Sequence, residues 1–158
     1  MSSANRGKVA EDLLKKKFKA IEANDASFTY ERIYDARSSM GKMSNPRVGD
    51  FALYHRGTNT VVEVKEVQHD YRLPCANFSL DQRARMRKRL LAGSKCYVVV
   101  YHSTTKKFRI LCLDYFGTQD AGSWNLIAEK ERTLDEVIGV LYAGKFSNLV
   151  SISEPAGE

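Results

Sequence analysis

Two acidic residues and a lysine have the types and spacing of a hydrolytic site. Glu63 and Lys65 are separated by one residue in the β-branched run TVVEVKEV (60–67), and Asp50 lies thirteen positions before Glu63. In a strand, residues two apart project from the same face, so Glu63 and Lys65 point one way and Val64 points the other. The pattern predicts that a carboxylate and an ammonium share one face of a strand.

This combination suits metal-assisted hydrolysis of a phosphodiester. Asp50 and Glu63 can supply hard oxygen ligands to Mg²⁺, and Lys65 can orient the attacking water or neutralise charge that develops on the phosphate. An exposed ion pair between strands is the alternative, because E-x-K is common in strands. The triplet is compatible with both interpretations, and the neighbouring elements are needed to distinguish them.

The composition limits the fold and the location. With 158 residues, 43% hydrophobic and 28% charged, the chain has room for one domain, which we expect at 1–146, followed by a tail at 147–158. No run of about 18 apolar residues suggests a membrane span, and the charged start does not resemble a signal peptide. We therefore expect a cytoplasmic protein that needs no membrane and no small-molecule cofactor. Cys75, Cys96 and Cys112 have no metal-site spacing and are expected to be buried free thiols.

The net charge of +6 favours polyanionic partners. Much of it lies in two clusters, Lys15–Lys17 with Lys19, and Arg83, Arg85, Arg87, Lys88 and Arg89. Either cluster can be an ordinary solvated helix face. Together they make contact with a phosphate backbone a reasonable expectation.

The segments before the triplet predict a helix, a strand and a hairpin. Apolar spacing predicts a helix at 4–23, in which Glu11 lies at the edge of the apolar face and is either inward-pointing or a surface residue. A strand is expected at 27–36 and a loop at 37–49, which carries Lys42 and Arg47. Strands at 51–55 and 60–67 flank turn chemistry at 56–59, so the hairpin should bring Asp50 beside the strand of Glu63.

The segments after the triplet predict two capped helices and two strands. Residues 68–77 are expected to be irregular. Ser79 and Gln82 then have the spacing of a capping box, which predicts a helix that extends to about Leu91. Strands follow at 95–102 and 107–115. Thr133 opens a second capping box for a helix that ends at Gly144.

The order of these elements, with Asp50, Glu63 and Lys65 at the middle strands, resembles the PD-(D/E)xK nuclease core. Glu11 matches the glutamate of that family's first helix, whereas Gly49 stands where the family usually has a proline. The resemblance implies an α/β (α+β mixed), restriction-endonuclease-like fold, with a central mixed sheet of about five strands flanked by helices.

Within that superfamily, the chain is most similar to RecU-type Holliday-junction resolvases. Asn5-Arg6-Gly7 followed by Glu11 resembles their N-R-G…E signature, and EVKEV (63–67) resembles their E-A-K-E-T strand. The segment at 77–82 resembles the one that ends in H-Q, and 96–101 and 108–116 resemble the two strands that follow. The long insertion of that family is replaced by 37–49, so the chain resembles a shortened, phage-type relative.

The resemblance implies a Mg²⁺-dependent endonuclease, for which Mn²⁺ can substitute. Asp50, Glu63, the Val64 carbonyl and Glu11 would hold the metal, Lys65 would position the water, and the product would carry a 5′-phosphate. Gln82 matches a glutamine assigned to the metal-bound water or DNA, although a helix cap explains it equally well.

The expected partners are branched or duplex DNA and a second copy of the chain, because symmetric cleavage of a four-way junction needs two sites related by a two-fold axis. A repair or restriction nuclease with another DNA target, and a non-catalytic nucleic-acid-binding protein on the same fold, remain alternatives. The residues expected to contact DNA are Arg6, Lys42, Arg47, Arg72, Arg83, Arg85, Arg87 and Lys88.

Overall fold

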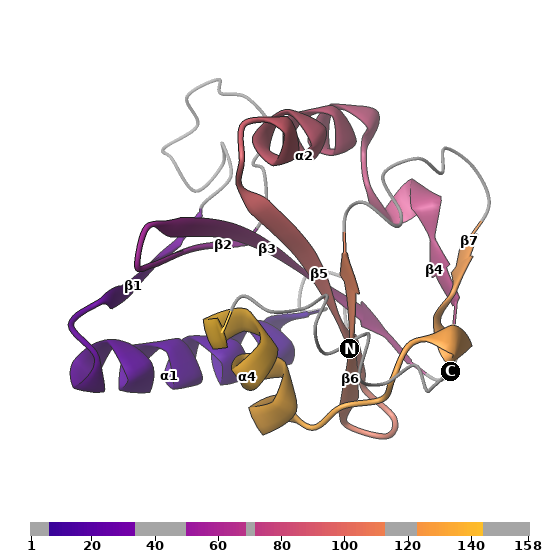
Figure 1. Ribbon diagram of the computed structural model, residues 1–158. Helices are drawn as coiled ribbons and strands as arrows, with labels where there is room; N and C mark the ends of the chain where they lie inside the picture. Colours follow the sequence, from indigo (N-terminus) through magenta and orange to yellow (C-terminus); the bar gives the residue numbers. More distant parts are fainter. Residues whose placement is uncertain (1–6, 34–49, 69–71, 113–122, 144–158) are drawn as a thin grey trace, which may run out of the picture.

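A mixed five-stranded sheet forms the centre of the molecule (Figure 1). The computed structural model describes residues 7–33, 50–68, 72–112 and 123–143. The strands lie in the order β1-β2-β3-β5-β6, with parallel pairing between β3 and β5 and antiparallel pairing elsewhere. Their bounds are β1 (Phe28–Arg32), β2 (Phe51–His55), β3 (Thr58–Val67), β5 (Lys95–His102) and β6 (Lys107–Cys112). The expected mixed sheet of about five strands is confirmed.

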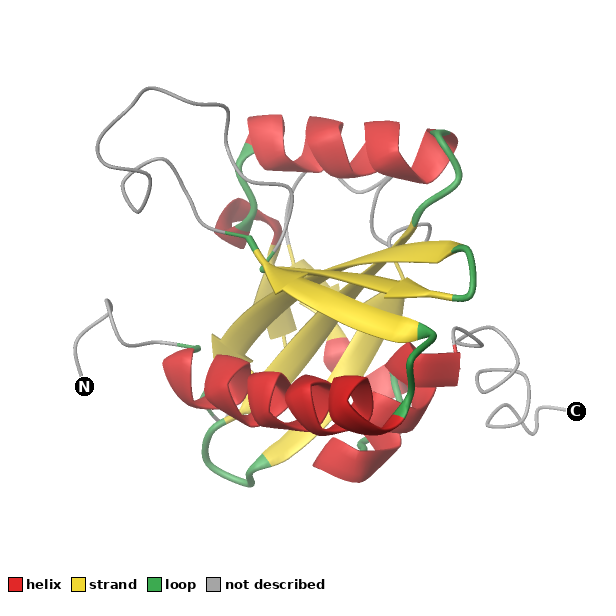
Figure 2. Cartoon of the chain, turned by 90° about the vertical axis from the view of Figure 1, so that its left-hand side faces the viewer, coloured by secondary structure: helices red, strands yellow, loops and turns green. Residues whose placement is uncertain are grey.

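Helices cover both faces of this sheet (Figures 1 and 2). Helices α1 (Lys8–Asn24) and α4 (Leu134–Ala143) lie on one face, and α2 (Leu80–Leu91) lies on the other. A small second sheet joins β4 (Arg72–Pro74) to β7 (Ser123–Asn125). The apolar side chains form two buried clusters, one on each face of the large sheet, as a three-layer fold requires.

The alternation of side chains along β3 separates the two clusters. Val62 and Val64 pack with Leu14 and Phe18 of α1, whereas Val61 packs with Met86 of α2. The face of β3 that carries Glu63 and Lys65 is therefore the α2 face. The predicted alternation of side chains between the two faces of the strand is confirmed.

The β2–β3 hairpin turns more tightly than expected. Arg56 and Gly57 both have positive φ, at 50° and 83°, and β3 begins at Thr58. Two left-handed residues form the two-residue turn that matches the twist of the paired strands. The expected four-residue connection at 56–59 was therefore too long.

Both predicted helix caps form. The Ser79 hydroxyl accepts a hydrogen bond from the Gln82 amide at 3.0 Å. At the start of α4, the Thr133 amide donates to Glu136 Oε1 at 2.8 Å, and the Glu136 amide donates to Thr133 Oγ1 at 3.2 Å. Each cap satisfies backbone amides that the first helical turn leaves without a partner.

The segment 68–77, expected to be irregular, contains regular structure. It holds β4 and the short 3-10 helix η2 (Cys75–Asn77). β4 pairs with β7, about fifty residues later in the chain, so no local pattern reveals this strand. None of the described helices is long and apolar enough to cross a membrane.

Some expectations fall outside the described residues. These are the side chains of Cys75 and Cys112, the loop at 37–49 and the tail at 147–158. Cys96 is buried and, among the described residues, forms no disulfide bond, as expected.

Candidate active site

The candidate site lies where β3 continues beyond the end of β2. Phe51, the first residue of β2, pairs with Val62, so the part of β3 from Glu63 onward runs past its neighbour on that side. A hollow of about 280 Å³ opens there. It is lined by Gly7, Glu11, Glu63, Val64, Lys65, Glu66 and Asn77.

Asp50 is bound to the strand that carries the motif. Its side chain is fully buried, and Oδ2 accepts a hydrogen bond from the Val64 amide at 2.7 Å. Its own amide donates to the Val62 carbonyl at 2.7 Å. Because a residue's N–H and C=O point to the same edge of a strand, the Val64 carbonyl also faces this open edge. The hairpin therefore brings Asp50 and the Val64 backbone together.

Glu63 and Lys65 form an ion pair on the α2 face of β3. Lys65 Nζ lies 3.0 Å from Glu63 Oε2, and it also donates to the Asn77 carbonyl at 2.7 Å. The same ammonium lies 4.6 Å from the centre of the Phe78 ring, a cation–π distance. The side chain of Glu63 is only 1% exposed. The pair therefore differs from the alternative of an exposed ion pair between strands, because it lies within one strand and its carboxylate is buried at a cost in desolvation.

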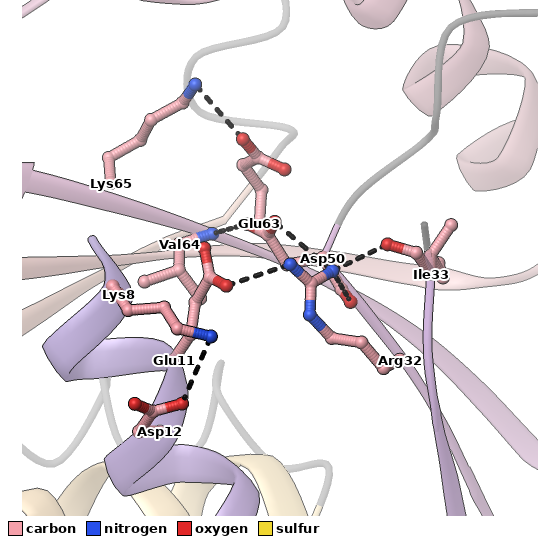
Figure 3. Close-up of polar contacts among 9 residues, drawn as sticks. All are labelled: Lys8, Glu11, Asp12, Arg32, Ile33, Asp50, Glu63, Val64 and Lys65. Atoms are coloured by element: carbon pink, nitrogen blue, oxygen red, sulfur yellow. Dashed lines mark hydrogen bonds and ion pairs between the residues drawn. The ribbon is translucent and has the colours of Figure 1, made fainter. Parts of the chain in front are cut away.

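Arg32 joins Glu11 to Asp50, and the sequence interpretation did not include it. Arg32 Nη2 lies 2.8 Å from Glu11 Oε1, while Nη1 donates to the Asp50 carbonyl at 2.9 Å and lies 3.6 Å from Asp50 Oδ1. Figure 3 shows the guanidinium between the two acidic residues. Glu11 thus points inward, one of the two orientations that its position allowed.

A local signal for Arg32 does exist. It follows Phe28 and Tyr30 at intervals of two on β1, and both of these rings pack in the cluster beneath α1. The guanidinium lies 5.4 Å from the centre of the Phe51 ring. A charged residue at an inward position of an alternating strand predicts a buried acidic partner.

The donor chemistry of the hollow fits a hard divalent cation. Glu11, Asp50 and Glu63 contribute three carboxylates in and around it, against the two cationic side chains of Arg32 and Lys65, while the Glu66 carboxylate accepts a hydrogen bond from the Gly7 amide. Oxygen ligands of this kind are those that Mg²⁺ prefers. In the part of the chain that the structure describes, the side chains are arranged as ion pairs, and no three acidic, histidine or cysteine groups are close enough to hold a metal (Figure 3).

Gln82 and Arg83, both proposed from the sequence, are buried on the inner side of α2. Their exposed fractions are 8% and 5%. Gln82 is not among the described residues that line the hollow, and its backbone takes part in the cap of α2. Arg83 does not belong to the exposed basic face of the helix.

The other expected DNA contacts divide into three groups. Arg87 and Lys88 of α2 and Arg72 of β4 are exposed, and Arg85 is half-buried. Arg6, Lys42 and Arg47 lie outside the described residues. The exposed members leave a basic face on the side of the sheet that carries Glu63 and Lys65.

The fold is similar to that of a solved Holliday junction resolvase, Hjc from the archaeal hyperthermophile Archaeoglobus fulgidus. The two chains are 19% identical, the match covers 84% of this chain and 97% of the resolvase, and the TM-score is 0.53. No family model and no curated protein matches the sequence. At this identity the likeness shows the fold, and the restriction-endonuclease-like architecture is confirmed.

Proposed function

We propose that this protein is a metal-dependent endonuclease that hydrolyses phosphodiester bonds of DNA and leaves 5′-phosphate ends. The observation that carries the proposal is the convergence of Glu11, Asp50, Glu63 and Lys65 on the open edge of β3. Glu63 pairs with Lys65, and Glu11 and Asp50 share the guanidinium of Arg32. A surplus of carboxylates in a protein of net charge +6 needs a reason other than solubility.

The position of each residue suggests its role in the proposed reaction. Asp50, Glu63 and the Val64 carbonyl would hold Mg²⁺, with Glu11 approaching from α1. When bound, the ion supplies charge stabilisation at the phosphate and a more acidic water. Lys65, held by Glu63, Asn77 and the Phe78 ring, is placed to orient that water and to stabilise negative charge on the phosphate. Gln82 remains a proposed contact to metal-bound water or DNA, although it is not among the described residues that line the hollow.

The basic face of α2 is the surface proposed to bind the DNA backbone. Arg87 and Lys88 are exposed on the side of the sheet toward which Glu63 and Lys65 point, and Arg72 on β4 lies on the same side. Arg6, Lys42 and Arg47 remain proposed contacts from segments outside the described residues. Phosphate contacts of this kind set affinity and its dependence on salt.

The proposed substrate is a four-way DNA junction cut by a homodimer. The fold of a Holliday junction resolvase and the sequence resemblance to RecU-type resolvases support this choice. The short segment at 37–49, which replaces a long insertion of those resolvases, favours a nuclease with another DNA target as the second candidate.

Cleavage of a synthetic four-way junction tests the proposal. The junction, a linear duplex and single strands are incubated with wild type or Asp50→Asn, in Mg²⁺ or in EDTA. We expect paired nicks in the junction by the wild type in Mg²⁺ only. Cleavage of every duplex would identify the second candidate, and equal cutting by Asp50→Asn would exclude the assigned mechanism. Lys65→Ala should bind the junction without cutting it.

The proposed DNA face has its own test. Replacing Arg85, Arg87 and Lys88 by glutamine should weaken binding to all DNA and lower the slope of log affinity against log salt by roughly one per lost phosphate contact. The control of equal charge replaces three exposed lysines outside α2 and β4, in Lys106→Gln with Lys107→Gln and Lys130→Gln. An equal loss in both variants would mean that only net charge matters.

A further inference from the structure

Glu66 makes a long-range contact that no part of the proposed reaction uses. Its Oε1 accepts a hydrogen bond from the Gly7 amide at 2.7 Å, although the two residues are 59 positions apart. Glu66 follows Lys65 on β3 and therefore points to the opposite face, toward α1. Both Gly7 and Glu66 line the candidate hollow.

Gly7 is the residue from which α1 begins. Its φ is +81°, a left-handed conformation that favours glycine, and it caps the helix without a side chain of its own. The carboxylate of Glu66 thus supplies an acceptor from another element at the positive end of the α1 dipole. The start of α1 is in this way bound to β3, the strand that carries Glu63.

The position of Glu11 depends on this start. The Glu11 amide donates to the Gly7 carbonyl at 2.9 Å, the first backbone hydrogen bond of the helix. A Cβ placed on Gly7 would lie 3.8 Å from Glu11 Oε2, so the Glu11 carboxylate folds back beside Gly7. Any movement of Gly7 would therefore move the Glu11 carboxylate relative to Glu63.

We propose that Glu66 is a positioning residue that holds Glu11 at the site through the Gly7 amide. This inference rests on the proposed nuclease function, in which Glu11 approaches the metal from α1. The contact needs an acceptor oxygen and no negative charge, whereas a metal ligand needs the charge of the carboxylate. Glutamine at position 66 keeps the first property and removes the second.

The test compares Glu66→Gln with Glu66→Ala. For cleavage of the junction, we expect Glu66→Gln to stay within about threefold of wild type. In Glu66→Ala, kcat should fall by about tenfold while KM for DNA changes little, and the Mg²⁺ concentration at half-maximal rate should rise. The split between kcat and KM separates misplacement of Glu11 from weaker DNA binding.

Amide hydrogen exchange in the first turn of α1 gives a second readout that needs no cleavage. We expect faster exchange at Glu11 in Glu66→Ala and wild-type exchange in Glu66→Gln. Equal losses of activity in both variants, with wild-type exchange in Glu66→Gln, would overturn the proposal and make Glu66 a charged ligand. Wild-type exchange in Glu66→Ala would also overturn it. If the wild type cut no DNA, the nuclease function would fail, and the exchange result would still decide whether Glu66 holds α1.

Discussion

Helix α1 and strand β2 each connect two polar clusters of different character. At one end lies the cluster proposed to be catalytic, called the catalytic cluster below, which consists of Glu11, Arg32, Asp50, Glu63 and Lys65. At the other end lies the distal cluster, which consists of Asp25, Ser27, His55 and Tyr142. Glu11 and Asp25 stand at opposite ends of α1, and Asp50 and His55 stand at opposite ends of β2.

The distal cluster has one carboxylate, which accepts its hydrogen bonds from neutral groups, and His55 Nε2 lies 3.6 Å from Asp25 Oδ2. Asp25 accepts hydrogen bonds from the Ser27 amide at 2.9 Å, from the Ser27 hydroxyl at 2.6 Å and from the Tyr142 hydroxyl. His55 donates through Nδ1 to the Tyr142 carbonyl at 2.8 Å, and its ring stacks on Tyr142 with 4.4 Å between ring centres. The cluster joins the ends of α1, β2 and α4.

The catalytic cluster has more carboxylates than cations, and its partners are charged. Arg32 serves both Glu11 and Asp50, and Lys65 serves Glu63. Buried acidic groups in excess of their counter-charges are costly for a fold and useful for binding a cation. The difference supports a structural role for the distal cluster and the cation binding proposed for the catalytic cluster.

The sharpest test of this contrast exchanges one acidic group in each cluster. We expect Glu63→Gln to lower cleavage by at least about a hundredfold, because one metal ligand is lost while the size of the side chain is kept. Asp25→Asn should leave cleavage within about twofold and lower the melting temperature, because the hydrogen bonds from Ser27 and Tyr142 are weakened. Initial rates and thermal unfolding of both variants measure the two effects.

Similar effects of Glu63→Gln and Asp25→Asn on cleavage and stability would contradict the proposed difference between the two clusters. A Glu63→Gln protein that still cuts but melts at a lower temperature, as expected for Asp25→Asn, would make the buried pair with Lys65 a structural feature. An Asp25→Asn protein with a large loss of cleavage at unchanged stability would extend the catalytic cluster to both ends of α1.

Substitution of Arg32 is expected to have a smaller effect, and it tests directly the balance of acidic and basic groups in the catalytic cluster. In Arg32→Gln, Glu11 and Asp50 lose their shared cation, so we expect a loss of about 2 kcal/mol in the free energy of unfolding. Mg²⁺ should raise the melting temperature of this variant more than that of the wild type, because a cation that binds only the folded state stabilises it. Thermal unfolding with and without Mg²⁺ at equal ionic strength measures both.

Lys17→Gln is the matched control for Arg32→Gln. Lys17 pairs with Asp135 at 2.7 Å, but the two side chains are 42% and 81% exposed. Such a surface pair contributes little, so the free energy of unfolding should change by less than about 0.5 kcal/mol. A similar response to Mg²⁺ in both variants would show that the ion acts on surface charge and not on the catalytic cluster.

The parts of the fold that depend on short-range patterns could be predicted from the sequence. The alternation along 60–67 placed Glu63 and Lys65 on one face, because a strand has a period of two. Ser79 and Thr133 marked the starts of their helices in the sequence, because a capping box joins two residues that are only three positions apart. Asp50 could be placed beside β3, because a hairpin joins neighbouring segments.

The parts that depend on contacts between distant segments could not be predicted in this way. β4 is a strand only because β7 pairs with it, and Glu66 caps α1 only because the sheet brings Gly7 to β3. Arg83 is buried with Gln82 and Met86 on the side of α2 that packs on the sheet, and a basic run does not reveal which side this is. Arg32 lies between these cases, since its inward position was readable but its two acidic partners were not.

The last prediction concerns acid and alkaline stability of the distal cluster. Hydrogen bonds from the Ser27 side chain, the Tyr142 hydroxyl and the Ser27 amide hold the pKa of Asp25 below its ordinary value of 3.8. The stabilisation from this lowered pKa is complete above pH 3.8 and is lost as the pH falls further. The bond to Asp25 raises the pKa of Tyr142 above its ordinary 10.0, so this stabilisation is complete below pH 10 and is lost as the pH rises.

Tyr142→Phe isolates this bond from the rest of the molecule. Burial and the nearby Arg109 lower the pKa of His102 to about 4, so wild type and variant both lose stability as the pH falls below 6.5. Only the difference in melting temperature between the two proteins therefore reports on Asp25. We expect this difference to be constant near neutral pH and to shrink both in acid and above pH 10, with no change in cleavage. Equal melting temperatures at every pH would mean that Tyr142 stabilises the cluster only through its ring stacked on His55, which phenylalanine keeps. A non-zero difference that is independent of pH would mean that the hydroxyl does not act through the ionised carboxylate of Asp25.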